Sequence, residues 1–564
     1  MSLRRLFLLA VLAVFFLPSF VIADPEPLYY AEWEVVYDGP AGEGDLPYRM
    51  SHDAAGNLYI IGYSVGIDTQ KDLIVLKYSP TGELVYEYRY DGENHADDKG
   101  YQFHVYDNGE VYLIGSDNLR YLFAYLNSAG ELQWSEVDNE YNYFIFGLEI
   151  GIVEDDADYL FTAYSIFEED LLVNCFDPSG VTQWQDVYPT DYAYQFVYDM
   201  KHDGQGNVYV AGTVFTPDPF RYTNYTVIKY DRTEGRRWNY LAEVGSSHGC
   251  LWSDEAHFIA FDEQGNVYVT GQLEFHDPDY TRDYSPFTVK LDSDGNVQWT
   301  ALYEGESEND YGDYLWLDQD GNVYVIVNIA ETQRRASLLK YDSTGVFQWE
   351  HEITVPAYAK IGIINMQPVE GDGVYLTGYG NNGGNSTGVM LKYSFSGDIN
   401  GYYLIPESEE IHTFAYDCYP ANDGAVYLMS HTRQLDVLNT NDIVLQKISP
   451  CYGCLIDDEC FDDGATVPEN GCLVCAVDQS RTQWTNNDGA TCDDGLFCNG
   501  VDECNAGACE VHAGDPCEEN ETCDEVNDEC VGGDDDTVDD DTTDDDTTDD
   551  DTVDDDTTDD DTTD

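Results

Sequence analysis

An all-β fold built from repeated four-stranded units is predicted by three features of this 564-residue sequence. A turn of the form D-x-x-G-N, followed by a strand of alternating apolar residues, recurs at intervals of about fifty residues. Each copy is followed by a second turn, in which Asp precedes Gly by three positions and Trp by seven. No stretch of the chain beyond its leader has the apolar periodicity of a helix.

The first turn is clearest at residues 53–62, which read D-A-A-G-N-L-Y-I-I-G. Full copies recur at residues 203–212, 262–271 and 318–326, and weaker copies lie between and after them. One tyrosine in each following strand, here called the marker tyrosine, allows the copies to be counted. The marker tyrosines, spaced by 47 to 59 residues, are Tyr59, Tyr112, Tyr159, Tyr209, Tyr268, Tyr324, Tyr375 and Tyr427. They predict eight copies.

The second turn is clearest at Asp342, Gly345 and Trp349, and it recurs at Asp177 and Asp292. Gly and Asn accept the positive φ of tight turns, so the G-N and T-G pairs predict two short hairpins in each copy. One copy therefore divides into four strands, expected at residues 313–318, 323–329, 336–341 and 346–352.

Four-stranded units repeated at this period, each with a recurring aromatic residue, are typical of a β-propeller. The eighth copy ends at Pro450 and lacks a fourth strand, whereas residues 32–39 (E-W-E-V-V-Y-D-G) match residues 298–305 (Q-W-T-A-L-Y-E-G). We therefore predict an eight-bladed β-propeller that residues 31–37 close by completing the last blade, which hides the strand edges. A seven-bladed propeller would require the third copy to be spurious, against its well-formed second turn at Asp177.

These repeats resemble the D-x-x-G-N-V-Y-V-x-G repeats of bacterial extracellular β-propeller proteins, over about residues 29–450. The resemblance implies a fold but no particular activity, because that family is mostly known as repeats of unassigned role. The D-x-x-G-x-x-x-W half is also similar to the tryptophan-docking motif of quinoprotein dehydrogenases and of outer-membrane assembly scaffolds. A quinoprotein of that kind often carries an adjacent Cys-Cys pair, and the sequence has none.

Residues 1–23 have the pattern of an export signal, with Arg4 and Arg5 before an apolar stretch and Ala23 at the cleavage site. The alternative, a twin-arginine signal for a folded protein, is disfavoured by the strongly apolar middle region. No later stretch is long and apolar enough to span a membrane. We expect a secreted or cell-surface protein.

The chain carries 111 Asp and Glu against 24 Lys and Arg, a formal net charge of −87. Such a surface repels nucleic acid and anionic lipid, and it suits basic or metal-bridged partners. Solubility alone is an equally good explanation of the charge. We expect a monomer whose partner is a glycan or a protein outside the cell.

Residues 451–531 are predicted to form a cystine-rich module, because an even set of twelve cysteines in an exported chain is typical of a disulfide framework. It resembles the short cystine-rich repeats of secreted deltaproteobacterial proteins. The twelve are Cys451, Cys454, Cys460, Cys472, Cys475, Cys492, Cys498, Cys504, Cys509, Cys517, Cys523 and Cys530. Zinc held by the two C-x-x-C pairs is the alternative.

Residues 24–450 hold three further cysteines, of which Cys175 and Cys418 are expected to be buried small apolar residues on strands. Residues 532–564 repeat Asp-Asp-Asp-Thr-Thr and are predicted to be a disordered acidic tail. We expect no cofactor; calcium is the one ion that the tail and the Asp-rich turns at Asp292 and Asp318 would accept, although those turns are better explained as hairpins.

No catalytic motif stands in a credible structural context. Residues 62–66 match G-x-S-x-G, but they end a predicted strand and lack the strand-turn-helix elbow that this motif needs. The 11 His residues include no H-E-x-x-H and no close pair at metal-binding spacing.

Binding is therefore expected on the face of the propeller that carries the long connections, because loops on a rigid scaffold usually hold binding sites. The long connections are predicted at residues 64–71, 91–100, 213–224, 243–255 and 272–286. The aromatic candidates on this face are Phe215, Phe220, Tyr222, Trp252, Phe275, Tyr280 and Tyr284. The first hypothesis is a binding or adhesion scaffold. An extracellular propeller hydrolase or lyase with acidic loop residues is the alternative, and a structural spacer without ligand is the third hypothesis.

Overall fold

The computed structural model describes residues 29–532, apart from residues 93, 138–149, 167–169, 189–194, 216–222, 243–253, 277–281, 306–308, 330–334, 356, 359, 370–372, 382–383, 407–410, 422, 435–440, 458 and 468–469. The predicted export signal and acidic tail lie outside the described residues. Contacts divide the chain into two compact units, residues 1–463 with 476–483 and residues 464–475 with 484–564. No helix of the described part is long and apolar enough to cross a membrane.

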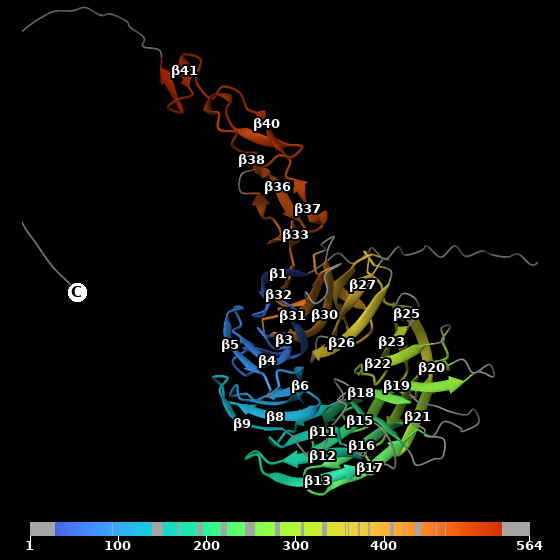
Figure 1. Ribbon diagram of the computed structural model, residues 1–564. Coiled ribbons are helices and arrows are strands. Elements are labelled where there is room, and N and C mark those ends of the chain that lie inside the picture. Colours follow the sequence, from blue (N-terminus) through green and yellow to red (C-terminus); the bar gives the residue numbers. More distant parts are fainter. Residues whose placement is uncertain are drawn as a thin grey trace, which may run out of the picture. The chain divides into compact units, whose positions relative to one another are not determined.

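The first unit contains eight four-stranded antiparallel sheets, which we number 1 to 8 along the chain (Figure 1). Sheet 1 consists of β2 (Leu46–His52), β3 (Leu58–Val65), β4 (Lys71–Tyr78) and β5 (Leu84–Tyr90), and sheet 2 of β6 (Asp98–Val105), β7 (Val111–Asp117), β8 (Arg120–Leu126) and β9 (Leu132–Val137). Sheet 3 consists of β10 (Gly151–Glu154), β11 (Leu160–Ile166), β12 (Asp170–Phe176) and β13 (Thr182–Tyr188), and sheet 4 of β14 (Phe196–His202), β15 (Asn207–Phe215), β16 (Thr223–Asp231) and β17 (Gly235–Leu241).

Sheet 5 consists of β18 (Glu255–Phe261), β19 (Val267–His276), β20 (Arg282–Leu291) and β21 (Val297–Leu302), and sheet 6 of β22 (Asp310–Leu317), β23 (Val323–Ile329), β24 (Arg335–Tyr341) and β25 (Phe347–Glu352). Sheet 7 consists of β26 (Ile361–Val369), β27 (Gly373–Asn381), β28 (Ser386–Tyr393) and β29 (Ile399–Leu404), and sheet 8 of β30 (Ile411–Pro420), β31 (Val426–Gln434), β32 (Asn441–Pro450) and β1 (Tyr29–Tyr37). The four strands expected in the sixth copy are confirmed as β22 to β25, with ends shifted by up to three residues.

The N-terminal strand completes the last sheet. β1 pairs antiparallel with β32, from Tyr29 opposite Pro450 to Tyr37 opposite Ile443. The expected pairing of residues 31–37 with the end of the eighth copy is therefore confirmed. In Figure 1 the dark blue β1 lies beside the orange β32 and β31, although more than 400 residues separate the paired positions.

An aspartate holds the first turn in five of the copies, at Asp53, Asp155, Asp203, Asp262 and Asp318. Asp53 Oδ1 accepts the backbone N–H groups of Ala55 and Asn57, and the Tyr59 hydroxyl donates to Asp53 Oδ2 at 3.0 Å. Gly56 has a φ of +80°, which explains the glycine at this position. The same bonds recur around Asp203, Asp262 and Asp318. The marker tyrosines Tyr59, Tyr209, Tyr268 and Tyr324 are thereby buried with satisfied hydroxyls.

The second turn of most copies docks against the preceding sheet. A Cβ built on Gly345 of sheet 6 would lie 2.6 Å from Cδ2 of Trp299 in sheet 5, so only glycine lets the indole ring lie flat on the turn. Gly295 has the same relation to Trp238, at 2.8 Å. A Cβ built on Gly82 of sheet 1 would lie 3.1 Å from Cε3 of Trp33 in β1, so the same kind of contact joins sheet 8 to sheet 1.

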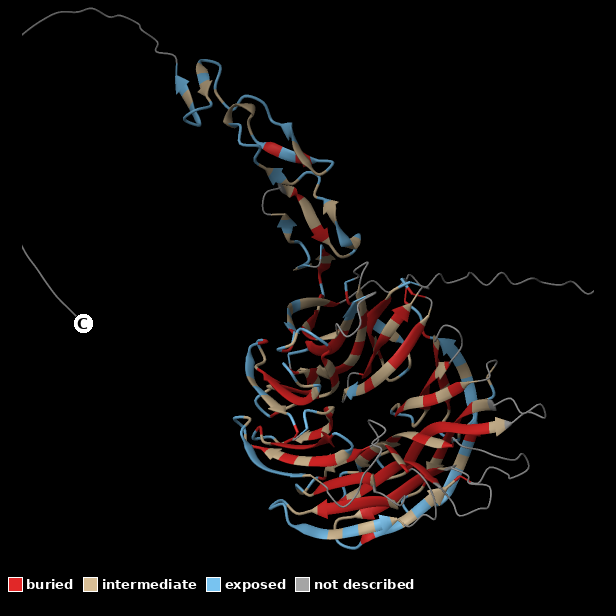
Figure 2. Cartoon of the chain, viewed as in Figure 1, coloured by how far each residue is buried: buried red, intermediate tan, exposed pale blue. Residues whose placement is uncertain are grey.

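Contacts between first strands link the sheets in chain order. β2 contacts β6, each later first strand contacts the next as far as β26 with β30, and β30 also contacts β2. The apolar core lies between neighbouring sheets, whereas the fourth strands are mostly exposed, as the pale blue β25 and β9 illustrate (Figure 2). Burial of both faces of the second and third strands, as in β3 and β4, explains their near-continuous apolar runs.

Two sequence predictions need correction here. The connection predicted at residues 272–286 consists largely of the ends of β19 and β20, in which Gln272 pairs directly with Pro286. Alternating apolar residues extend this hairpin beyond the consensus length of the repeat. In sheet 3, Phe161 rather than Tyr159 occupies the marker position, since Phe161 pairs with Cys175 as Tyr59 pairs with Lys77.

The cystine-rich region is held by disulfides. All twelve of its cysteines are disulfide-bonded, which confirms the predicted framework and leaves no thiolate for zinc. Five of the pairs are Cys451–Cys460, Cys472–Cys504, Cys492–Cys509, Cys498–Cys523 and Cys517–Cys530. Its short elements are β33 (Cys454–Ile456), β34 (Glu459–Phe461), β35 (Thr466–Val467), β36 (Asn470–Ala476), β37 (Ser480–Asn486), β38 (Thr491–Cys492), the 3-10 turn η1 (Phe497–Asn499), β39 (Asp502–Asn505), β40 (Ala508–His512), β41 (Glu521–Asp524) and β42 (Glu529–Gly532).

Candidate functional site

The predicted aromatic loop face is described only in part. Phe220, Tyr222, Trp252, Tyr280 and the side chain of Phe215 lie outside the described residues. Phe275 packs against the apolar core of sheets 4 and 5, and the Tyr284 ring lies 5.6 Å from that of Tyr311. Phe275 pairs with Asp283 and Tyr284 with Glu274, so the two aromatic side chains point to opposite faces of the sheet and are not brought together.

A cavity lies between sheets 2 and 3, and we call it the sheet 2–3 cleft. Its volume is about 1450 Å³. One wall comes from β7, β8 and β9, and the other from β10 to β13. Its aromatic residues are Tyr106, Tyr112, Phe123, Tyr125, Trp134, Tyr164 and Phe176; its acidic residues are Asp107, Glu110, Glu136, Glu154, Asp158 and Asp177; its uncharged polar residues include Asn108, Thr162, Asn174, Ser179, Thr182 and Gln185.

The cleft exists because the tryptophan docking is absent at this junction. A Cβ built on Gly180 of sheet 3 would meet no described atom within 4 Å, whereas the equivalent Gly345 lies against Trp299. Trp134 of sheet 2, which would dock on Gly180, is 44% exposed. The tryptophan and the glycine are both retained in the sequence, yet they stay apart although the two sheets share an apolar core, and the indole ring is accessible from the cleft.

The residues that hold the first turn are also replaced at this junction. Sheet 1 has Asp53, Tyr59 and Lys77 at three positions that contact one another. In sheet 2 these positions are Tyr106, Tyr112 and Tyr125, and in sheet 3 they are Asp155, Phe161 and Cys175. The lysine is therefore missing from both sheets that form the cleft, and this substitution is the sequence signal that could have located it.

The aromatic wall of the cleft keeps the ring geometry of the other sheets. The rings of Tyr112 and Trp134 lie 5.8 Å apart at an angle of 65°, close to the 6.0 Å and 66° of Tyr268 and Trp299. The ring of Tyr125 stacks parallel to Trp134 at 6.3 Å. Trp134 thus has its usual orientation, and its exposed ring face is a surface on which a ligand can stack.

Amide side chains form the polar part of the opposite wall. Asn174 donates from Nδ2 to Thr162 Oγ1 at 3.2 Å and accepts from Gln185 Nε2 at 2.9 Å. Asn174 is 5% exposed, so this pair of amides is fixed in place by burial and by bonding. Fixed donors and acceptors facing aromatic rings are the usual composition of a site that orients a small ligand.

The cleft has a negative potential. Glu110 Oε2 accepts the Tyr125 hydroxyl at 2.9 Å, and Glu154 pairs with His104 at 2.8 Å. Burial, with added repulsion from Glu154, raises the pKa of Tyr106 well above its ordinary value. Burial and the hydrogen bond to Glu110 raise the pKa of Tyr125 to about 12. Both phenols therefore stay neutral, and no Lys or Arg belongs to the described residues that line the cleft.

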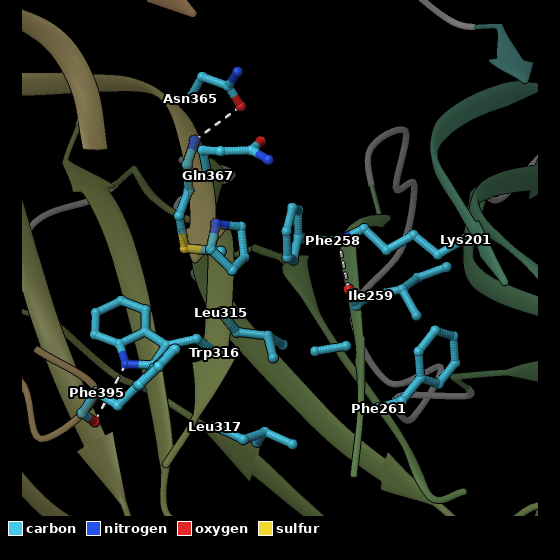
Figure 3. A pocket seen from close by; sticks show the side chains of 13 residues that line it. Lys201, Phe258, Ile259, Phe261, Leu315, Trp316, Leu317, Asn365, Gln367 and Phe395 are labelled. Carbon is cyan, nitrogen blue, oxygen red and sulfur yellow. Dashed lines mark hydrogen bonds between the residues drawn. The ribbon is translucent and has the colours of Figure 1, made fainter. Parts of the chain in front are cut away.

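A second cavity, of about 540 Å³, is lined by the first strands of sheets 4 to 7 together with Phe395 (Figure 3). The ammonium of Lys201 lies 3.2 Å from the ring centroid of Phe258 and donates to the carbonyl of Ile259 at 2.7 Å. Trp316 Nε1 donates to the carbonyl of Phe395 at 3.4 Å. These polar groups are engaged with neighbouring backbone, so the cavity presents mainly apolar side chains.

The ionisable groups on the first strands tie neighbouring sheets together. Asp199 accepts the backbone N–H of Ile259 at 2.9 Å, and Asp417 accepts that of Met50 at 3.1 Å. His257 lies between Glu255 and Asp313, at 3.0 and 3.1 Å. Burial lowers the His257 pKa, but the hydrogen bonds to these two carboxylates prevail and raise it to about 9. We assign these residues to the joints between sheets.

The Asp-rich turns, the G-x-S-x-G match and the cysteines Cys175 and Cys418 have the structural roles that the sequence predicted. Asp292 and Asp318 accept N–H groups of their own turns, as expected for hairpins. Ser64 of the G-x-S-x-G match is buried in β3, where its hydroxyl accepts a hydrogen bond from Arg89. Cys175 and Cys418 are buried free thiols on β12 and β30, as predicted. Burial raises the pKa of Cys175 to about 12 and that of Cys418 well above its ordinary value, so both thiols stay protonated.

Comparison with known proteins gives no family. No protein-family model and no curated protein matches the chain. Among solved structures, Sqt1 from Chaetomium thermophilum is similar at 10% identity over 75% of this chain and 99% of that chain, with a TM-score of 0.45. A protein of unknown function from Dyadobacter fermentans is similar at 10% identity over 75% and 100% of the two chains, with a TM-score of 0.37. Scores this low carry no argument about fold or function.

Proposed function

We propose that the chain is a secreted or cell-surface binding protein, an eight-bladed β-propeller that holds its ligand in the sheet 2–3 cleft. The observation that carries this proposal is the undocked junction, where Trp134 remains exposed beside an aromatic and polar cavity. Trp134 and Gly180 are the residues of a docked junction and yet stay apart, a feature that folding alone does not require. Binding sites are typically concave, with aromatic walls and a few fixed polar groups.

The closed eight-bladed arrangement is supported by three observations. β1 completes the sheet of β30 to β32, the first strands contact one another in chain order, and β30 contacts β2. Trp33 of β1 also docks on Gly82 of sheet 1. Location outside the cytoplasm is supported by the export-signal pattern of residues 1–23 and by the disulfide-bonded cysteines, because disulfides persist in oxidising compartments.

The alternative function is an extracellular hydrolase or lyase. General acid catalysis by a carboxyl group needs a raised pKa. Burial raises the pKa of Asp45, Asp98 and Asp417 to about 6 and that of Asp254 to about 7. Each of these four carboxylates accepts backbone N–H groups within or between sheets, and none lines either cavity described above. Their raised pKa values therefore give the enzyme hypothesis no support.

The test is a binding screen on the mature chain, residues 24–564, against arrays of glycans and of charged peptides. We expect saturable binding that Trp134→Ala abolishes and Tyr284→Ala leaves unchanged, because Tyr284 lies on the predicted loop face and not in the cleft. The reverse pattern would move the site to the loop face. Binding to neither array by the wild-type chain would contradict the proposal and favour a structural spacer.

A further inference from the structure

Five sheets of the first unit hold the ammonium group of a lysine at the position that corresponds to the sheet 2–3 cleft. A lysine of the third strand lies with its Nζ over the ring of the marker tyrosine, 4.8 to 5.4 Å from the ring centroid. These lysines are Lys77, Lys229, Lys290, Lys340 and Lys392. The face of a tyrosine or tryptophan ring attracts a cation, and the attraction is stronger when water is excluded.

Each ammonium also has oxygen partners. Lys77 Nζ lies 3.4 Å from Asp53, and Lys290 Nζ lies 3.4 Å from Asp262. Lys229 donates at 3.0 Å to the Ser293 carbonyl, which belongs to the turn of the next sheet. A docked junction therefore surrounds one ammonium with a tyrosine ring, a carboxylate or carbonyl, and the outer aromatic ring.

Sheet 3 has lost its lysine but has a substitute. Asp155, which corresponds to Asp53, pairs at 3.2 Å with Arg232 from the turn of sheet 4. Arg232 also pairs with Asp156 at 2.9 Å and lies over the ring of Tyr159. The negative charge of this turn is therefore compensated from within the chain.

Sheet 2 has lost its lysine without such a substitute. The ring pair of Tyr112 and Trp134 is retained, and Tyr125 takes the lysine position with a hydroxyl that cannot carry positive charge. Six carboxylates line the cleft. In the described part of the chain, the one basic side chain that pairs with any of them is His104, which pairs with Glu154. Glu136 pairs with Phe123 through the backbone of β8 and β9, but its carboxylate makes no ion pair or hydrogen bond with any described residue.

We propose that the sheet 2–3 cleft binds a ligand that carries ammonium groups on apolar stems, in the manner of the lysines of the other sheets. The inference rests on the proposed function, and it adds the chemical class of the ligand. Aromatic faces bind ammonium groups, and the carboxylates offset their charge. A neutral ligand would cover the same carboxylates and leave them desolvated without a counter-charge, which is costly. Drug-sized ligands fill about 300–1000 Å³, so a cleft of about 1450 Å³ accommodates a chain with more than one amino group.

The experiment is calorimetric titration of the mature chain at 0.15 M salt, where long-range attraction to the acidic surface is screened. The probes are spermine, a glucosamine tetramer, and the N-acetylated form of that tetramer, which has the same sugar backbone without the charges. We expect one saturable site for an amine probe and at least tenfold weaker binding of the acetylated tetramer. Which of the two amines binds more tightly distinguishes a polyamine from an amino sugar as the source of the ammonium groups.

Variants separate the cleft from the general acidity of the surface. Glu136→Gln should weaken amine binding by about tenfold, within the range of a single charge and ring contact. Glu83→Gln removes the same charge from an exposed turn of sheet 1 and should leave the affinity unchanged. Trp134→Ala should abolish the saturable site while the melting temperature stays close to that of the wild type.

Three outcomes would overturn the inference. Equal affinity for the glucosamine tetramer and its acetylated form would show a neutral ligand, and would leave the proposed function standing if Trp134→Ala still abolished binding. Amine binding that Glu136→Gln and Glu83→Gln weaken equally would be counter-ion attraction to the whole surface. Absence of amine binding, together with failure of both arrays in the screen above, would remove the proposed function as well.

Discussion

The junction between sheets 5 and 6 and the junction between sheets 2 and 3 differ in two features of the same repeat. At the first, Trp299 lies flat on Gly345, and Lys290 and Lys340 lie over their marker tyrosines. At the second, Trp134 has the same relation to its own tyrosine, but Gly180 is out of its reach and no lysine is present. The difference shows that two contacts of the repeat are independent. The tyrosine–tryptophan ring pair forms within one sheet, whereas the tryptophan–glycine contact joins one sheet to the next.

The largest effect should come from adding a side chain at a docked glycine. Gly345→Ala places a Cβ 2.6 Å from Trp299 at a φ of +84°, so strain and overpacking act together and should cost about 2–4 kcal/mol. Gly180→Ala meets no described atom and should cost only the backbone strain, about 1–2 kcal/mol. Thermal melting of the two variants checks the difference. Equal losses would contradict the docking account.

A smaller effect is expected from removing a built-in cation. Lys340→Met keeps the apolar stem but loses the hydrogen bond to the Tyr324 hydroxyl and the contact with its ring, and should cost about 1–2 kcal/mol. The converse change, Tyr125→Lys, supplies an ammonium to the open junction. It should compete with amine ligands and weaken their binding in calorimetry without lowering the melting temperature. Unchanged affinity in Tyr125→Lys would argue against an ammonium site.

Acid should stabilise the joints between sheets. Burial raises the folded-state pKa of Asp45, Asp98 and Asp417 to about 6 and of Asp254 to about 7, against about 3.9 in an unfolded chain. The folded state therefore binds more protons across this range, and the stabilisation is full below about pH 4 and lost as pH rises through 6 to 7. The melting temperature should rise between pH 7.5 and pH 5.

Asp98→Asn provides the control for this pH dependence. The variant cannot ionise, so the slope of melting temperature against pH should become shallower. It should also melt lower at every pH, because Asp98 accepts the N–H groups of both Gly92 and Asn118 and an amide offers one acceptor oxygen fewer. An unchanged slope would mean that this carboxyl does not govern the pH response.

Most of the fold could be predicted from the sequence because the turns of the repeat are marked by recurring residue types at fixed spacing. Asp53, Gly56 and Tyr59 form one bonded unit, so their recurrence identifies a hairpin even where the strands vary. The pairing of β1 with β32 followed from the match between Trp33 and Trp299. The extent of β19 and β20 did not follow, because strand pairing beyond a turn depends on what lies across the sheet rather than on local pattern.

The candidate site was missed because it is marked by departures from the repeat. The motifs of sheets 2 and 3 retain Trp134 and Gly180, and no local pattern reveals that these two residues stay apart. Replacement of the lysine by Tyr125 and by Cys175 was visible in the sequence, but its meaning required knowledge that the lysines contact the marker tyrosines. The distance between two sheets is a property of packing across a junction, which strand periodicity does not encode.

Hydrogen–deuterium exchange with and without spermine tests most directly whether the open junction is the ligand site. Our account predicts slower exchange in β9 (Leu132–Val137) and β13 (Thr182–Tyr188), the outer strands on either side of the sheet 2–3 cleft. It predicts no change in β21 (Val297–Leu302) and β25 (Phe347–Glu352), the equivalent strands of a docked junction. Protection confined to residues 272–286, or spread evenly over all eight sheets, would contradict it.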